Sequence, residues 1–323
     1  MTQMIQTIYK TVKMSICILL LAHLCACEPI HSTSLSGTNT AMPPKPNGAH
    51  KQVWGRMREN FKIARKQDNA QHQQIQKHIK KFTRQEKNLA KVSLQASPYL
   101  YYIVEQLEKR NMPGELALLP MIESNFQPGA ISHRGAAGLW QFIPSTGRIY
   151  GLKQDAWYDG RRDIKASTDA ALNYLSFLHK EFDNNWMLAL AAYNAGEGAV
   201  HRAIKRNKRA GKPITFWDLQ LPKETREYVP KFLALAQVIA NPEGHDISLP
   251  AIDNKPYFSF VNPGIAIHFN QAAKLADIDL SELKRLNPGY RQSTTHPKPQ
   301  GPKGLLLPIA NAQKFEYNLA NKR

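Results

Sequence analysis

Apolar residues recur at helical spacing through most of the chain between residues 97 and 245. The clearest stripe has apolar or small side chains at alternating steps of four and three, at Ile164, Thr168, Ala171, Leu175, Leu178 and Phe182. This spacing places them on one face of an α-helix. The segment from Trp186 to Ala192 is apolar on nearly all sides, so we expect it to form a helix buried at the domain centre.

Further helices are expected on both sides of this stripe. One follows Ser97-Pro98, and five of its residues lie on one face: Tyr99, Tyr102, Ile103, Gln106 and Leu107. Pro113 is well placed to start the next helix, with Leu116, Leu119 and Ile122 on its apolar side. Downstream, residues 224–239 have a helical pattern in which Pro230 should kink the helix or confine its regular part to the far side. Residues 97–245 are thus predicted to form one mainly α domain.

The segments that flank this domain differ from it in their pattern of polar and apolar residues. Residues 51–96 are very polar but favour helix, and predict one or two amphipathic helices that pack on the domain. Residues 250–323 predict a small α+β module. Its elements are expected in the order strand, helix, helix, strand, at residues 257–261, 271–276, 280–286 and 305–307.

The first 27 residues have the features of an export signal. Two lysines and no acid precede an apolar run from Met14 to Leu24, which is too short to span a bilayer comfortably. Leu24-Cys25-Ala26-Cys27 resembles the lipobox of bacterial lipoproteins, so Cys27 is expected to become the lipid-anchored mature N-terminus. An ordinary cleavable signal with incidental cysteines is the alternative.

Residues 28–50 are rich in Ser, Thr, Pro and Gly, which is typical of a flexible tether. Glu28 stands where an Asp usually retains lipoproteins at the inner membrane, so we expect an anchor in the outer membrane that faces the periplasm. All three cysteines lie in the signal, so the mature chain needs neither a disulfide framework nor a cysteine metal site. No metal or cofactor is expected.

The chain has a formal net charge of +18, which favours a polyanionic partner. Export argues against nucleic acid, whereas the cell wall carries the carboxylates of stem peptides. The alternative is that many of these charges simply form a solvated face.

Glu123 is the first candidate for chemistry. It stands at the end of the predicted Pro113 helix, after Leu119, Met121 and Ile122. Such neighbours should desolvate the carboxyl and raise its pKa, as a general acid near neutral pH requires. The alternative is a solvated glutamate at a helix end.

The second candidate segment is residues 135–144, Gly-Ala-Ala-Gly-Leu-Trp-Gln-Phe-Ile-Pro. Its glycines allow close backbone approach, the ring of Trp140 offers a face for a sugar, and Gln141 offers a donor and an acceptor. The alternative is a turn followed by a core tryptophan.

The third candidate segment is residues 191–196, Ala-Ala-Tyr-Asn-Ala-Gly. It places Tyr193 and Asn194 at the end of a buried helix that Gly196 terminates. Both side chains need hydrogen-bond partners there, because burying them unpaired is costly.

Together these residues resemble the three signature motifs of family 1 lytic transglycosylases. The motifs are Glu123-Ser124, Gly138-Leu139-Trp140-Gln141 and Ala192-Tyr193-Asn194-Ala195-Gly196, in that order and spacing. Residues 157–163 and 225–230 extend the resemblance to the membrane-bound type D subfamily, over roughly residues 50–310. Trp140 stands where many family 1 members carry Met, and the type D branch shows Trp there.

The resemblance implies a lysozyme-like helical fold and non-hydrolytic cleavage of peptidoglycan. The bond cut would be the β-1,4 bond between N-acetylmuramic acid and N-acetylglucosamine, with a 1,6-anhydromuramoyl product. Glu123 would act as acid and then as base, and the N-acetyl group of the substrate would stabilise the cationic centre. No second catalytic carboxylate is needed, and no Asp or Glu occurs from residue 124 to 154.

The resemblance also implies roles in substrate binding. Ser124 and Gln141 would position Glu123 and the acetamido group, in the motif that also contains Gly138 and Trp140. Tyr193, Asn194 and Tyr228 would line the cleft, and a purely structural role is the alternative for Tyr228.

Residues 250–323 resemble a degenerate LysM module, a sugar-binding unit. Residues 272–276, 280–283 and 286–288 match its helices, and residues 304–308 match its closing strand. The Pro-rich loop of residues 291–303 departs from the usual pattern. Because no regular LysM repeats follow, we expect weaker or differently targeted wall binding.

Three functions therefore remain: a lytic transglycosylase, a lysozyme-type hydrolase in which water attacks, and a non-catalytic peptidoglycan-binding protein. An intact Glu123 among all three motifs argues against the third, and the mass of the product would separate the first two. The expected partners are peptidoglycan glycan strands, which a monomer would cut while anchored to the membrane by its lipid.

Overall fold

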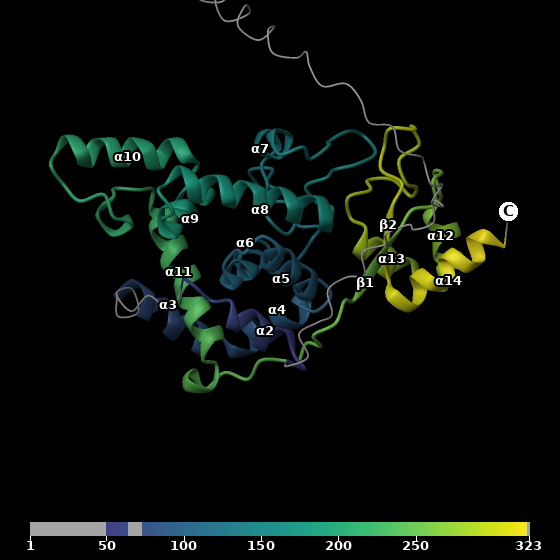
Figure 1. Cartoon of the computed structure of the whole chain (residues 1–323), viewed down its shortest axis with the longest axis horizontal. Coiled ribbons are helices and arrows are strands. Elements are labelled where there is room, and N and C mark those ends of the chain that lie inside the picture. The colour runs from purple at the N-terminus through teal and green to yellow at the C-terminus, as the bar shows by residue number, and fades with distance from the viewer. Residues whose placement is uncertain (1–49, 64–72, 322–323) are drawn as a thin grey trace, which may run out of the picture. The chain divides into compact units, whose positions relative to one another are not determined.

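The computed structural model describes residues 50–63 and 73–321. These residues form a mainly helical domain and a small C-terminal module with a two-stranded sheet (Figure 1), as predicted. The signal, Cys27 and nearly all of the tether lie outside the described residues. Within the two described ranges, no helix is both long and apolar enough to cross a membrane.

Three helices occupy the described part of residues 51–96, where one or two were expected. They are α2 (Val53–Glu59), α3 (Gln73–Arg84) and α4 (Glu86–Ala96). The buried side of α3 carries Ile75 and Ile79, and this helix packs against α11 (Lys223–Ala240). The polar N-terminal segment thus lies against the domain through a thin apolar face.

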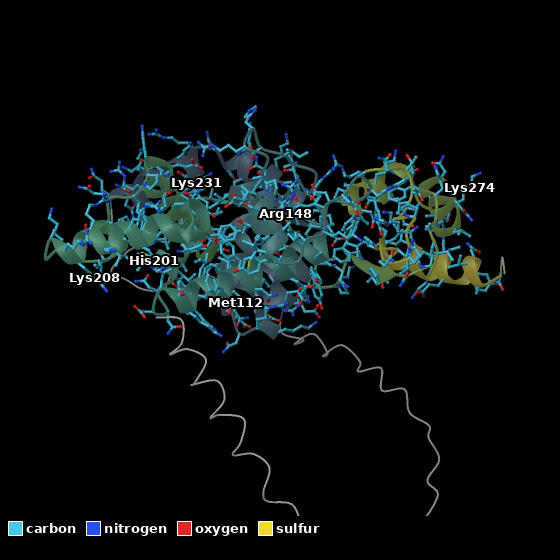
Figure 2. All side chains as sticks on the ribbon, turned by 90° about the horizontal axis from the view of Figure 1, so that it is seen from above. Met112, Arg148, His201, Lys208, Lys231 and Lys274 are labelled. Atoms are coloured by element: carbon cyan, nitrogen blue, oxygen red, sulfur yellow. The ribbon has the colours of Figure 1, made fainter. Side chains whose placement is uncertain are left out.

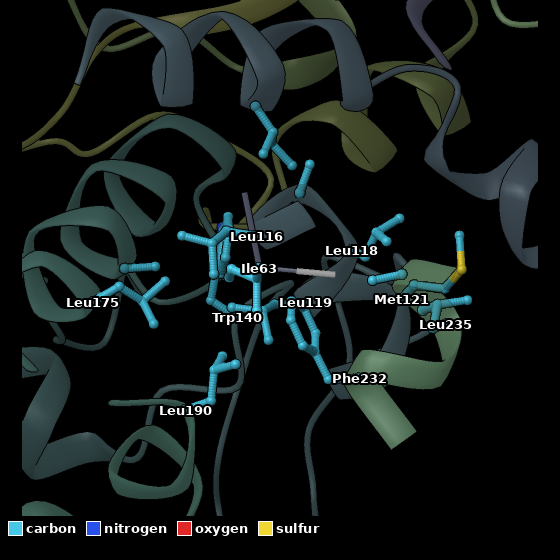
Figure 3. Close-up of a cluster of buried hydrophobic side chains, with 14 of the residues drawn as sticks. Ile63, Leu116, Leu118, Leu119, Met121, Trp140, Leu175, Leu190, Phe232 and Leu235 are labelled. Carbon is cyan, nitrogen blue, oxygen red and sulfur yellow. The ribbon is translucent and has the colours of Figure 1, made fainter. Parts of the chain in front are cut away.

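The segment that ends at Glu123 runs through the core. After α5 (Leu100–Lys109), Pro113 precedes a 3-10 helix, η2 (Gly114–Leu118), which continues into the short helix α6 (Leu119–Glu123). The predicted helix is therefore α-helical only in its second half. Figure 3 shows Leu116, Leu119 and Trp140 in one cluster of buried apolar side chains that also contains Leu175, Leu190 and Phe232.

The two strongest helix predictions are confirmed. Helix α8 (Ile164–Glu181) buries the predicted stripe, and Asp163 caps its N-terminus by accepting a hydrogen bond from the Ala166 amide. Helix α9 (Trp186–Ala195) is capped by Asn185 and buries residues 188–192. Helix caps of this kind stabilise the first turn.

Two helices differ from the expectation. Helix α10 (Glu197–Arg209) was not predicted, because it is largely polar and buries only Val200, Ala203 and Asn207. Helix α11 continues through Pro230, so the expectation that its regular part would be confined to the far side of this residue is wrong. Pro230 is itself buried, and packing of the residues around it against α3 and α9 holds the helix together despite the missing N–H.

The C-terminal module has the predicted order of elements. Strand β1 (Phe258–Val261) pairs antiparallel with β2 (Leu305–Pro308), and α12 (Phe269–Ala276) and α13 (Leu280–Leu286) lie between them in sequence. Helix α14 (Ile309–Ala320), which was not predicted, adds Ala312 and Phe315 to the core of the module.

The Pro-rich loop docks the module onto the helical domain. Tyr158 of the domain inserts into the core of the module, 5.3 Å from Tyr290 between ring centroids. The Arg291 amide donates to the Trp157 carbonyl, and His296 Nε2 lies 3.1 Å from Asp155 Oδ2. The departure from the LysM pattern thus forms part of an interface within the chain.

Candidate active site

A groove of about 800 Å³ crosses the helical domain. It is bordered by the end of α6, residues 132–146, the end of α9 and the first half of α11. The lining residues are Ile122, Glu123, Ser132, His133, Arg134, Ala136, Trp140, Gln141, Phe142, Ile143, Thr146, Tyr174, Tyr193, Asn194, Ala195, Gly196, Glu224, Glu227, Tyr228 and Lys231. Six of the eight residues predicted to cut or bind the substrate line this groove: Glu123, Trp140, Gln141, Tyr193, Asn194 and Tyr228. Ser124 and Gly138 are not among its lining residues.

Glu123 is the last residue of α6, and its carboxyl is half-buried in this groove. The backbone turns sharply after it, because Asn125 and Phe126 have φ angles of 51° and 55°. Burial raises the pKa of Glu123 to about 7, although the hydrogen bond from Tyr228 and the charge of Lys231 both lower it. The carboxyl can therefore both donate and accept a proton near neutral pH.

Tyr228 contacts the carboxyl directly. Its hydroxyl donates to Glu123 Oε1 at 2.6 Å from α11, 105 positions further along the chain. Tyr228 is buried at 7 % exposure, and the bond itself is part-buried at the wall of the groove. A direct contact with Glu123 goes beyond the cleft-lining role that was expected.

Ser124 ties the end of α6 to the turn that follows Gly138. Its Oγ lies 2.9 Å from the Leu139 carbonyl oxygen and 3.1 Å from that of Pro120. Both partners are backbone atoms, so Ser124 positions Glu123 through the main chain.

Gly138 occupies a place that no other residue fits. Its φ is 86°, and a β-carbon there would lie 1.8 Å from the Arg161 carbonyl oxygen. The expected close backbone approach thus occurs within the chain. Gln141, also in the left-handed region, donates from Nε2 to the Gly138 carbonyl at 2.9 Å and closes the turn.

The expectation that the ring of Trp140 offers a face to a sugar is wrong. Trp140 is fully buried, and its Nε1 donates to Thr168 Oγ1 at 3.0 Å. A buried indole with its N–H paired is a stable core arrangement. The residue contributes to the groove through its carbonyl oxygen, which accepts a hydrogen bond from the Tyr193 hydroxyl at 2.8 Å.

The polar side chains at the end of α9 have the partners that their position requires. Besides its bond to Trp140, Tyr193 packs against Tyr174 with ring centroids 5.5 Å apart. Asn194 Oδ1 accepts a hydrogen bond from Thr225 Oγ1 at 2.8 Å, which ties α9 to α11.

Arg161 supports the site and was missed by sequence reasoning. Its guanidinium forms a fork with Asp159, at 2.9 Å and 2.7 Å, and donates to the carbonyl oxygens of Gly135 and Phe142. It therefore holds both ends of the turn around Gly138. Arg161 lies within residues 157–163, which extend the resemblance to the type D subfamily. That resemblance assigned no role to these residues, so the role of Arg161 was not predicted.

Helix α11 adds charged groups that the sequence reasoning did not include. Glu224, Glu227 and Lys231 line the groove beside Tyr228, and their spacing of three and four places them on one face. Glu224 pairs with Arg134 at 3.6 Å. This spacing was the feature of the sequence that could have placed these charged residues beside Tyr228.

The site holds acid–base groups and hydrogen-bonding side chains. Among the residues that the structure describes, no three His, Cys, Asp or Glu side chains are arranged to hold a metal ion. One carboxyl with a raised pKa in an extended groove suits proton transfer to a bond of a long polymer.

Two family models match the chain. One is described as "Transglycosylase SLT domain" and matches residues 101–216; the other is "Lytic transglycosylase MltD, LysM-like domain" and matches residues 261–323. The first contains Glu123, the turn at Gly138 and the end of α9. The second covers most of the C-terminal module.

Known proteins with similar sequences carry related names. Membrane-bound lytic murein transglycosylase D of Escherichia coli (strain K12) is 45% identical over 251 residues, which cover 78% of this chain and 55% of that protein. The putative tributyltin chloride resistance protein of Alteromonas sp. (strain M-1) is 44% identical over 51% of this chain and 77% of that protein. Among solved structures, an inactive mutant of the lytic transglycosylase Slt from Pseudomonas aeruginosa matches 45% of this chain and 24% of its own, with 28% identity and a TM-score of 0.35.

The motifs and the family models place residues 101–216 among transglycosylase SLT domains and residues 261–323 among the LysM-like domains of lytic transglycosylase MltD. The similarity to membrane-bound lytic murein transglycosylase D extends over 78% of this chain. The chain spans about half the length of these type D relatives.

Proposed function

We propose that the chain is a lytic transglycosylase that cleaves the β-1,4 bond between N-acetylmuramic acid and N-acetylglucosamine in peptidoglycan. The observation that carries this proposal is the carboxyl of Glu123, half-buried in a groove of about 800 Å³ with its pKa raised to about 7. A general acid works best when its pKa lies near the operating pH. The same group then serves as the base.

In the first step, the protonated carboxyl of Glu123 gives its proton to the glycosidic oxygen. The bond between this oxygen and C1 of the muramic acid breaks, and the departing sugar leaves with a hydroxyl group. The carbonyl oxygen of the N-acetyl group on the same ring bonds to C1 and takes up the positive charge. Tyr228 stabilises the Glu123 carboxylate that has formed, because its hydroxyl donates to Oε1.

In the second step, the C6 hydroxyl attacks C1 and displaces the N-acetyl oxygen. Glu123 accepts the hydroxyl proton and returns to its starting state, and the product is a 1,6-anhydromuramoyl end. Ser124, Gly138 and Gln141 hold the turn beside the reacting bond, while Tyr193 and Asn194 border the strand.

Hydrolysis by water is the alternative reaction, and Glu224 is the carboxylate that favours it. Glu224 lines the groove and its side chain is 68% exposed, so it meets water freely. Ordinary glycosidases use such a second carboxylate. Mass spectrometry of digested sacculi separates the reactions, because the anhydro product is lighter by one water.

The test compares the parent chain with Glu123→Gln and Glu224→Gln. We expect anhydro ends from the parent and from Glu224→Gln, and none from Glu123→Gln, because an amide cannot supply the proton. Ends that contain the added water and disappear in Glu224→Gln would establish the hydrolase. Wall binding without cleavage by the parent and by both variants would establish a binding protein.

The chain is further proposed to act from the outer membrane, anchored by a lipid on Cys27 and facing the periplasm. The type D relative is named as membrane-bound, which supports this proposal. The expected result is that the full chain sediments with the outer-membrane fraction and that Cys27→Ser moves it to the soluble fraction. Retention of Cys27→Ser in the membrane would contradict it.

A further inference from the structure

A second pocket, of about 450 Å³, lies beside the groove. Its lining comes from α3, from the next residue Gln85 and from one residue of α11: Lys77, His78, Lys80, Lys81, Arg84, Gln85 and Glu227. Glu227 also lines the groove, so the two hollows meet at this side chain. Helix α3 runs next to α11 (Figure 1) and packs against it, which fixes the pocket relative to Glu123.

The charges of this pocket are unbalanced. Glu227 is already paired, because His78 Nε2 lies 3.0 Å and Lys77 Nζ 3.5 Å from its carboxylate oxygens. The pairing lowers the pKa of Glu227, so its negative charge is firmly held. Lys80, Lys81 and Arg84 are exposed, and none of them has an acidic partner within 4 Å among residues 50–63 and 73–321.

The excess positive charge extends into the groove. Lys231 lines the groove, and its pKa is lowered by burial and by the positive charge of Lys81. These two lysines are therefore near enough to repel each other, which an anion between them would relieve. Figure 2 labels Lys231 on the helical domain.

The cations of α10 do not form such an extension. Arg202, Lys205, Arg206 and Arg209 line a pocket of their own that shares no residue with the groove. Figure 2 marks His201 and Lys208 on the same helix. Of these two basic surfaces, the one on α3 adjoins the groove, so a strand bound in the groove would meet it.

We propose that the α3 pocket, formed by Lys80, Lys81 and Arg84, binds the carboxylates of the stem peptide on a muramic acid residue of the bound strand. The proposal rests on the proposed function, because only a glycan strand bound in the groove would place such peptides next to Glu227, where the groove meets the α3 pocket. Stem peptides are attached through the lactyl group of muramic acid and carry free carboxylates. Lys and Arg bind carboxylates as a point charge and as a fork, respectively.

The proposal predicts a preference for strands that carry peptides. The test measures kcat/KM for the full chain on two substrates, peptide-bearing strands and the same strands stripped of peptides by an amidase. The variant combines Lys80→Gln, Lys81→Gln and Arg84→Gln, and the control combines Arg202→Gln, Lys205→Gln and Arg209→Gln. Both remove three exposed positive charges from helix surfaces, so both should keep the fold, which circular dichroism checks.

We expect the α3 variant to lose about tenfold in kcat/KM on peptide-bearing strands, as three exposed charge pairs would contribute. Its rate on stripped strands and both rates of the control should match the parent. The preference of the parent should also shrink as salt rises.

Equal losses on both substrates, or equal losses in the α10 control, would overturn the subsite and point to a general charge effect. No loss in the α3 variant would overturn it as well. A parent chain that forms no anhydro ends from either substrate would instead overturn the proposed function, so the two failures are distinguishable.

Discussion

At the scale of single residues, the raised pKa of Glu123 has a consequence for stability. In the unfolded chain its carboxyl has a pKa of 4.5, and in the folded chain the pKa is about 7. Between these values the folded state holds a proton that the unfolded state has released. The free energy of unfolding therefore falls as pH rises through this window, and stays lower above it.

Glu123→Gln should remove this pH-dependent loss. One pKa unit corresponds to about 1.4 kcal/mol. At pH 8 we therefore expect the free energy of unfolding of the variant to be about 1–3 kcal/mol higher than that of the parent. At pH 4 the two should agree, since the glutamate is protonated in both states. Urea unfolding at the two pH values measures the difference, and a constant offset would contradict the raised pKa.

Tyr228 should set the pH range of activity. Its hydrogen bond favours the ionised form of Glu123 and lowers the pKa of the carboxyl. In Tyr228→Phe the pKa should therefore rise. The parent should lose kcat/KM as pH rises through about 7, because the free enzyme must be protonated to act as an acid. In Tyr228→Phe this decline in kcat/KM should occur at higher pH, and the maximal rate should be lower.

Tyr193→Phe is the matched control for this measurement. The Tyr193 hydroxyl donates to the Trp140 carbonyl and not to Glu123. Loss of this hydroxyl should lower the rate by loosening the groove. The pH at which kcat/KM declines should stay the same. A decline that shifts equally in both variants would assign the effect to general changes in the groove.

At the scale of elements, the turn around Gly138 is the least tolerant part of the site. Gly138→Ala would force a β-carbon to 1.8 Å from the Arg161 carbonyl at a φ of 86°. The turn must then move away from Arg161, so we expect loss of nearly all activity and a decrease of more than about 3 kcal/mol in the free energy of unfolding.

Gly135→Ala is the control, because it shares the backbone strain without the clash. Its φ is 76°, and nothing lies within 4 Å of a β-carbon at this position. We expect it to cost only about 1 kcal/mol, from the left-handed backbone, and to keep most of the activity. Similar losses in the two variants would contradict the role of the close approach to Arg161.

The elements that could be predicted from the sequence are those with a dense apolar pattern. The stripe of α8 and the apolar run of α9 predicted both helices within a few residues. Helix α10 carries too few apolar positions for periodicity to detect it. One of the two expectations for α11 was that its regular part would lie on the far side of Pro230, because local propensity does not include the packing that keeps the helix whole.

At the scale of the whole molecule, the motifs predicted which residues would lie near the groove, but not what they contact. Tyr228 meets Glu123 across 105 positions, and Trp140 meets Thr168 across 28. Such pairs depend on how helices pack, and a single sequence carries no signal for them. This is why the ring of Trp140 was expected in the groove and lies in the core.

The docking of the module onto the helical domain predicts that they unfold together. Tyr290 lies at the interface: it packs against Tyr158, and its hydroxyl donates to the Gly304 carbonyl at 2.7 Å. Tyr290→Ala should lower the free energy of unfolding by about 3–5 kcal/mol, as loss of a buried aromatic ring does. Tyr317→Ala, at a position 71% exposed in the same module, should change it little.

Tryptophan fluorescence can show where this loss is felt, because all five tryptophans lie between residues 54 and 217, outside the module. If the interface couples the two parts, Tyr290→Ala lowers the midpoint of the fluorescence transition along with that of the circular dichroism transition. An unchanged fluorescence midpoint with an earlier dichroism step would mean that the module unfolds alone. The coupled result is expected because the residues next to Tyr158 include Asp159 and Arg161, whose hydrogen bonds hold the turn at Gly138. A change in the module would then also reach the groove and lower kcat.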